Sequence, residues 1–255
     1  MVGSCPESRI IQGLIEQISN ATLNRTRLFV AKYPIGVDSH ATKIEERLNI
    51  ESNDIRMVAI HGIGGIGKTT IAKAVYNKIV DGFEGSSFLE NVKERSSTND
   101  GIIQLQEILL SKLLGDGNLK VDNISRGINV IKERLCHKRV LLVLDDVDEQ
   151  KQIENLLGKC DWLTSGSRIL ITTRDKDVLT ILEQDPLIYK VDDMNQYEAC
   201  ELFSLYAFQK NEPEEAYLQL TNQIINYANG LPLALKIIGS DLRRRSKWES
   251  ESALN

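Results

Sequence analysis

The sequence lacks the features that mark secreted or membrane-anchored proteins. Its four cysteines, at positions 5, 136, 160 and 200, include no C-x-x-C pair, which argues against a zinc site or a redox pair. Sparse, unpaired thiols are typical of a reducing compartment. The first residues have neither the charged nor the apolar region of a signal peptide. No apolar run approaches the roughly 18 residues of a membrane span. We therefore expect a cytoplasmic protein, with the nucleus as the alternative compartment, and no contact with a membrane.

An excess of basic residues is absent as well. The 255 residues include 31 Lys and Arg against 36 Asp and Glu, a formal net charge of −5. No overall positive field attracts nucleic acid. One local basic run, Arg243-Arg244-Arg245 with Lys247, leaves nucleic-acid binding open as a third hypothesis. We favour a solvated helix end there, because basic residues suit the negative end of a helix dipole.

One glycine-rich stretch, residues 62–70, reads G-I-G-G-I-G-K-T-T. It fits the phosphate-binding loop pattern, in which two spaced glycines are followed by lysine and threonine. The run 55–60 before it is apolar and β-branched, which predicts a buried strand, and residues 69–80 carry apolar positions at helical spacing. Strand, glycine loop and helix together favour a nucleotide site over an ordinary glycine-rich turn.

Each residue type in this loop suits phosphate. Glycines let the backbone adopt conformations closed to other residues, so that successive N–H groups can surround an anion. The following helix adds free N–H groups and the positive end of its dipole. Lys68 would contact the β- and γ-phosphates, and the Thr69 hydroxyl would bind Mg²⁺. The expected nucleotide-binding residues of the loop are Gly62, Ile63, Gly64, Gly65, Ile66, Gly67, Lys68, Thr69 and Thr70.

Two further buried strands should end beside the loop. Residues 139–144 form a continuous apolar run followed by Asp145 and Asp146, and residues 168–173 form another, followed by Arg174. Such runs are typical of central parallel strands, whose carboxyl ends bind ligands. Asp145 would bind Mg²⁺, Asp146 would orient or deprotonate an attacking water, and Arg174 would contact a γ-phosphate. Solvated loop aspartates and a surface salt bridge are the alternatives.

Strands and helices alternate up to residue 191, and helices alone follow. The other expected strands are 86–92 and 186–191, and the other expected helices are 7–19, 39–48 with Ser39 as N-cap, 101–114, 124–135, 197–208, 214–228 and 231–244. This order predicts an α/β fold, a doubly wound parallel sheet of the P-loop NTPase type followed by a small all-helical subdomain. We place a linker helix at 1–20, the nucleotide-binding domain at 21–191 and the helical subdomain at 192–255.

These motifs, in their order and spacing, resemble the NB-ARC module of plant disease-resistance proteins of the NLR class. The matching stretches are residues 62–70, F-L-E-N-V at 88–92, L-L-V-L-D-D-V-D at 141–148, G-S-R-I-L-I-T-T-R-D at 166–175, residues 197–208 and G-L-P-L-A at 230–234. Asp148, which closes the third stretch, is similar to the subclass with an N-terminal TIR domain. By this resemblance, residues 1–20 are a linker helix after a TIR domain that this chain lacks.

The resemblance implies a molecular switch that rests with ADP, is active with ATP and hydrolyses ATP slowly at most. It implies that Ile35 and Val37 cover the base from one side, and that Pro232 of the ARC1-like helical subdomain packs near the adenine. The implied partners are the TIR and leucine-rich-repeat domains of full-length members, together with oligomeric partners. We expect a truncated product or fragment, without the NAD cleavage of TIR domains. The alternative is a productive P-loop ATPase or kinase of an unrelated pathway.

Overall fold

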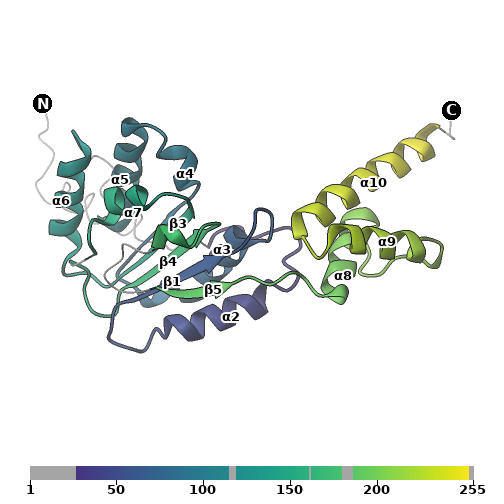
Figure 1. Cartoon of the computed structure of the whole chain (residues 1–255), viewed down its shortest axis with the longest axis horizontal. Coiled ribbons are helices and arrows are strands. Elements are labelled where there is room, and N and C mark those ends of the chain that lie inside the picture. The colour runs from purple at the N-terminus through teal and green to yellow at the C-terminus, as the bar shows by residue number, and fades with distance from the viewer. Residues whose placement is uncertain (1–26, 115–118, 161, 180–185, 253–255) are drawn as a thin grey trace, which may run out of the picture.

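The computed structural model describes residues 27–114, 119–160, 162–179 and 186–252. An α/β unit built on a five-stranded sheet is followed by a helical unit toward the C-terminus (Figure 1). The linker helix expected within residues 1–20 lies outside the described residues. Within these ranges, no helix has the length and apolar character needed to cross a membrane.

The sheet is parallel and has the strand order β2-β3-β4-β1-β5. Its strands are β1 (Arg56–His61), β2 (Gly85–Leu89), β3 (Val140–Val147), β4 (Arg168–Thr173) and β5 (Leu187–Lys190). Since β4 lies between β1 and β3, the residues that follow these three strands meet at one edge of the sheet. The predicted α/β fold, a doubly wound sheet of the P-loop NTPase type, is confirmed.

Helices cover both faces of the sheet. Those of the α/β unit are α2 (Val37–Leu48), α3 (Lys68–Ile79), α4 (Val92–Arg95), α5 (Asn99–Leu114), α6 (Ile124–Leu135) and α7 (Gln150–Leu157). Alternate residues of β1 face opposite sides: Val58 and Ile60 pack with α2 and α3, whereas Met57 and Ala59 belong to the cluster that includes α5 and α6. Figure 1 shows α2 below the sheet and α5 and α6 above it. The strands are therefore apolar on both faces, as the sequence indicated.

The helical unit has a core of its own. It consists of α8 (Gln196–Ala207), α9 (Leu218–Ala228) and α10 (Pro232–Ser252), and its buried residues include Phe203, Ile225 and Leu235. The chain before α2 also packs on this core, since the Tyr33 ring meets the Tyr206 ring edge to face at 5.0 Å between centroids. This segment therefore contacts the helical unit before it leads into α2 of the α/β unit.

The structure corrects two boundaries near the loop. Helix α2 begins at Val37, two residues before the predicted start at Ser39. The N-cap is therefore Gly36, with φ 73°, and not Ser39. Glycine adopts this left-handed conformation without strain, so the chain can turn sharply into the helix. Strand β2 ends at Leu89 and not at residue 92, because Asn91 has φ 53° and interrupts the extended run.

Other elements also differ from their predicted extents. Strand β3 continues to Val147, so that Asp145 and Asp146 belong to the strand and do not follow it. Helix α9 begins at Leu218 after a 3₁₀ turn, instead of at residue 214, and α10 continues to Ser252 instead of ending at 244. Helices α4 and α7 were not predicted, because four and eight residues are too few for a clear apolar period.

A fully buried arginine closes the end of the sheet opposite the glycine loop. Arg168, the first residue of β4, donates hydrogen bonds of 2.5–2.8 Å to the main-chain oxygens of Leu48, Asn49, Ser52, Asp54 and Ser167. All but Ser167 belong to the end of α2 and the connection from α2 to β1. The planar guanidinium has five N–H donors, enough to satisfy these carbonyl groups together. Arg168 therefore fixes the connection that leads into β1 and the loop.

We predict that Arg168→Met lowers the free energy of unfolding by about 3–5 kcal/mol, because it leaves several buried carbonyl groups without a donor. Urea denaturation followed by circular dichroism measures the change. Arg56→Met is the matched control, since Arg56 pairs with Asp54 at 2.9 Å on a partly exposed surface and should cost about 1 kcal/mol or less. Equal losses in the two variants would contradict the role given to Arg168.

Candidate functional site

The glycine loop joins β1 to α3 at the carboxyl edge of the sheet. Gly65 and Gly67 have φ values of 83° and 102°, in the left-handed region that favours glycine. Gly67 is also the N-cap of α3, and no side chain caps the helix there. The first N–H groups of α3 are therefore available to an anion at the positive end of the helix dipole.

The Lys68 side chain is held almost out of water by its own loop. It is 7% exposed, and its ammonium donates to the main-chain oxygens of Gly62 at 2.8 Å and Ile63 at 3.0 Å. Burial lowers the pKa of Lys68, and the nearby Arg174 charge lowers it further, against the opposing effect of Asp146. Carbonyl groups compensate a cation only partly, so the position suits a ligand with negative charge.

The side chains of Asp145, in β3, and Thr69, in α3, are hydrogen-bonded to each other. The Thr69 hydroxyl donates to both carboxylate oxygens of Asp145, at 2.9 and 3.1 Å, and the Thr172 hydroxyl donates to one of them at 2.7 Å. Burial raises the pKa of Asp145, which is 1% exposed, although these hydrogen bonds oppose the rise. The pair fits Mg²⁺, an ion that binds oxygen ligands and relies on one or two carboxylates together with phosphate and water. No cluster of three or more His, Cys, Asp or Glu suited to a metal occurs in the described part of the chain.

A bulge in β3 positions Asp146. The pairing of β3 with β4 shifts between Leu144 and Val147, and Asp146 has φ 57°, a conformation that aspartate adopts more readily than most residues. Its N–H donates to the Thr172 hydroxyl at 2.8 Å, and its carboxylate lies 3.4 Å from Nε of Arg174. The bulge thus places Asp146 beside the Arg174 guanidinium.

Arg174 lies directly against the glycine loop. A Cβ atom built on Gly64 would approach its Nη1 to 3.1 Å, so the absence of a side chain at this position leaves room for the guanidinium. The Arg174 side chain is 58% exposed and is therefore free to move toward a ligand. The structure brings the loop, the two aspartates and the arginine together at one edge, as the strand ends predicted.

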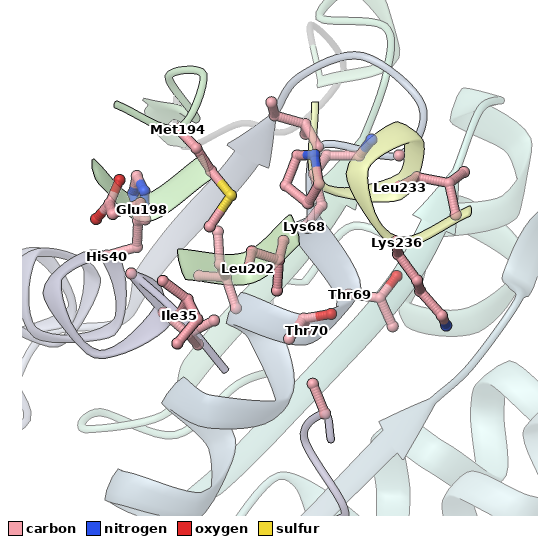
Figure 2. Close-up of a pocket in the computed structure, with 18 of the residues that line it drawn as sticks. Ile35, His40, Lys68, Thr69, Thr70, Met194, Glu198, Leu202, Leu233 and Lys236 are labelled. Carbon is pink, nitrogen blue, oxygen red and sulfur yellow. The ribbon is translucent and has the colours of Figure 1, made fainter. Parts of the chain in front are cut away.

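A cavity of about 380 Å³ lies between the loop and the helical unit (Figure 2). Its size suits a nucleotide. Its walls include loop and α3 residues 65–71, together with Ile35, Val37, His40, Asp146, Arg174, Met194, Glu198, Leu202, Pro232, Leu233 and Lys236. The three residues expected to enclose a base, Ile35, Val37 and Pro232, all lie on these walls. Their contact with a base stays a prediction.

Some expected nucleotide-binding residues do not line the cavity. Gly62, Ile63 and Gly64 lie outside its walls, and the Ile63 side chain is 61% exposed. Asp145 lies behind Thr69 and reaches the cavity only through that hydroxyl. In this arrangement, residues 62–64 can contribute to binding only through their main chain, and Asp145 only through Thr69.

Sequence reasoning missed several residues of the cavity. Figure 2 shows His40, Glu198, Met194 and Leu202 on one side of the cavity, and Lys236 on the other side together with Thr69. These residues belong to segments far apart in the sequence and form no motif. Glu198 carries a local signal, since it completes a capping box with Asn195 at the start of α8, but that signal predicts a helix start and not a site.

We predict that Lys68→Ala weakens nucleotide binding by at least about 30-fold, since truncating one partner of a buried charge pair typically costs 2–5 kcal/mol or more. The thermal unfolding temperature, compared between nucleotide-free chains, should not fall. Because the folded-state pKa of Lys68 lies below its usual value, the charged form costs stability at neutral pH. Fluorescent-nucleotide titration and thermal unfolding measure the two effects. Lys78→Ala is the control, because Lys78 lies on the same helix but bonds to Thr42. Unchanged affinity in Lys68→Ala would contradict the assignment.

We predict that Asp145→Asn weakens ATP binding in the presence of Mg²⁺ by at least about tenfold, a loss that removal of a mere supporting residue can already cause. In EDTA the variant should bind like the unaltered chain, because asparagine can still accept from Thr69 and Thr172. Asp148→Asn is the control, as Asp148 pairs with Lys93 at 2.8 Å instead. An equal loss with and without Mg²⁺ would exclude a metal role.

Comparison with known proteins agrees with this geometry. Residues 37–213 match the NB-ARC domain. The chain is 45% identical over 251 residues to the disease resistance protein RPV1 of Vitis rotundifolia, which covers 96% of this chain and 18% of that protein. It is 45% identical over 243 residues to RUN1 of the same species, covering 93% and 18%. The TMV resistance protein N of Nicotiana glutinosa is 38% identical over 262 residues, covering 97% and 22%.

The chain thus spans about a fifth of the length of the curated relatives it matches. The family match includes the glycine loop, the aspartate pair and Arg174, and it continues into the helical unit. The resemblance stated from the order of the motifs is confirmed, and this chain belongs to the NB-ARC family of nucleotide-binding domains.

Proposed function

We propose that this chain is the nucleotide switch of a plant disease-resistance receptor, resting with ADP and active with ATP. The observation that carries the proposal is that the cavity has walls from both units, with the loop on one side and the start of α10 on the other. The N–H group of Leu233 donates to the Gly65 oxygen at 3.2 Å. A ligand in this cavity would contact both units, so its chemical state can bias how they are arranged.

The residues of the cavity fit an adenine nucleotide with Mg²⁺. The loop N–H groups, the start of α3 and Lys68 would bind the phosphates. Thr69 and Asp145 would hold Mg²⁺, which when bound neutralises phosphate charge. Ile35 and Val37 would cover the base from one side, and Pro232 would pack against it from α10.

The pair between Arg174 and Asp146 offers a means to tell ATP from ADP. In the structure Asp146 holds the guanidinium at 3.4 Å, a partly exposed and therefore weak contact. A γ-phosphate would present Arg174 with a more highly charged partner and draw it away from Asp146. Asp146 would then be free to orient or deprotonate a water. Arg174 is the only arginine among the described residues that line the cavity, so we expect slow hydrolysis at most.

The relatives that the chain matches are named for disease resistance, and we extend that role to this chain. In such a receptor, TIR and leucine-rich-repeat domains and further copies would be the partners that read the switch, in the cytoplasm or the nucleus. A productive P-loop ATPase or kinase is the second candidate. It would require fast turnover, for which the cavity offers no second arginine from the described residues.

Titration of Arg174→Ala with ADP and ATP tests the proposal. We predict that ATP affinity falls about ten- to a hundredfold, the range for a lost hydrogen bond between charged groups, while ADP affinity changes little. Arg47→Ala is the control, because Arg47 bonds to the Ile188 oxygen away from the cavity. ATP turnover by the unaltered chain should stay well below ~1 s⁻¹. Equal loss of both nucleotides would refute γ-phosphate sensing, and faster turnover would favour the enzyme.

A further inference from the structure

Lys236 is a cation on the cavity wall that no described residue holds in an ion pair. Lys68 is held by its loop and Arg174 is paired with Asp146, whereas Lys236 comes from the helical unit. Its side chain is exposed, and in the described part of the chain no ion pair or hydrogen bond holds its ammonium. The helix that carries Lys236 determines where its side chain lies in the cavity.

The start of α10 rests directly on the glycine loop. The Leu233 N–H donates to the Gly65 oxygen, and a Cβ atom built on Gly65 would lie 2.9 Å from Cβ of Leu233. Pro232, Leu233 and Lys236 all line the cavity and are spaced so that they share one face of the helix. Leu235, on another face, is fully buried in the core of the helical unit. The orientation of α10 is therefore fixed by contacts on both sides, and Lys236 follows one turn after the residues that touch the loop.

Lys236 lies at the phosphate end of the cavity. Both Lys236 and Thr69 line the cavity, and Figure 2 shows them on the same side of it, away from Ile35, His40 and Glu198. Thr69 is the loop residue that faces Asp145, where the metal and the outer phosphates would lie. Three acidic residues line the cavity: Asp146 is engaged with Arg174, Glu198 accepts from the main chain of Asn195 at the other end, and Asp192 is the third. Within the described part of the chain, none of them forms an ion pair with Lys236.

We propose that Lys236 binds the phosphate tail of the nucleotide, so that the helical unit reads the number of phosphates directly. This inference rests on the proposed function and adds a specificity-determining residue to it. Because Lys236 reaches the tail only while α10 sits on the loop, nucleotide and docking favour each other. Thermodynamic linkage requires that phosphate binding strengthens the docked arrangement by the same factor as docking strengthens phosphate binding.

The test compares adenosine, AMP and ADP on the full chain by isothermal titration calorimetry. Lys236→Ala should weaken ADP binding about tenfold, as expected for one charge-assisted contact, weaken AMP less and leave adenosine unchanged. Lys236→Arg should restore most of the affinity. Arg244→Ala is the matched control, because it removes one positive charge from an exposed position on the same helix outside the cavity.

A second measurement, limited proteolysis, reports whether α10 is docked on the loop. ADP should slow proteolysis of the connection between the units, residues 192–195, in the unaltered chain and in Arg244→Ala, but less in Lys236→Ala. If the unaltered chain binds ADP and Lys236→Ala binds it equally well, the Lys236 proposal is overturned and the proposed function stands. Equal weakening of adenosine and ADP would show an effect on α10 packing and would also overturn it. Failure of the unaltered chain to bind any nucleotide would overturn both.

Discussion

The site depends on a lysine ammonium that is kept almost out of water and hydrogen-bonded by main-chain oxygens. Lys68 can occupy that position because the loop before α3 turns through glycines whose left-handed conformations bring the Gly62 and Ile63 oxygens within 3.0 Å. Carbonyl oxygens and nearby carboxylates offset the cost of burying this cation only in part, and an anionic ligand would relieve the rest. The rest of the site follows from this loop: Arg174 lies over Gly64, and Leu233 of the helical unit rests on Gly65.

The two units share the cavity but contribute different chemistry. The α/β unit supplies the N–H groups, the metal-binding pair and the contact between Asp146 and Arg174. The helical unit supplies an apolar wall and Lys236. Both units would enclose the base, whereas mainly the α/β unit would hold the phosphate tail. The interface between the units would therefore respond to which nucleotide is bound. Such sensitivity is what a switch requires, because a ligand shifts an equilibrium only by its difference in affinity for the two states.

Much of this could be predicted from local sequence, and the failures have physical causes. Buried parallel strands are apolar on both faces, so β1, β3 and β4 were recognisable, and with them the residues at their ends. The bulge that turns Asp146 toward Arg174 left no signal, because aspartate tolerates φ 57° without the glycine that would mark it. Arg168 was taken as the first residue of a strand, since nothing local reveals that four of its five hydrogen bonds go to carbonyl groups more than 100 residues away. Lys236 and Glu198 enter the cavity only through the docking of the helical unit, which depends on contacts distant in sequence.

The most direct test of the central claim is to denature the purified chain and identify the released small molecule by mass spectrometry. A cavity that encloses an adenine nucleotide between two units should retain it through purification, so the account predicts close to one ADP per chain. Release of no nucleotide, from a chain that also fails to bind added ADP, would contradict it.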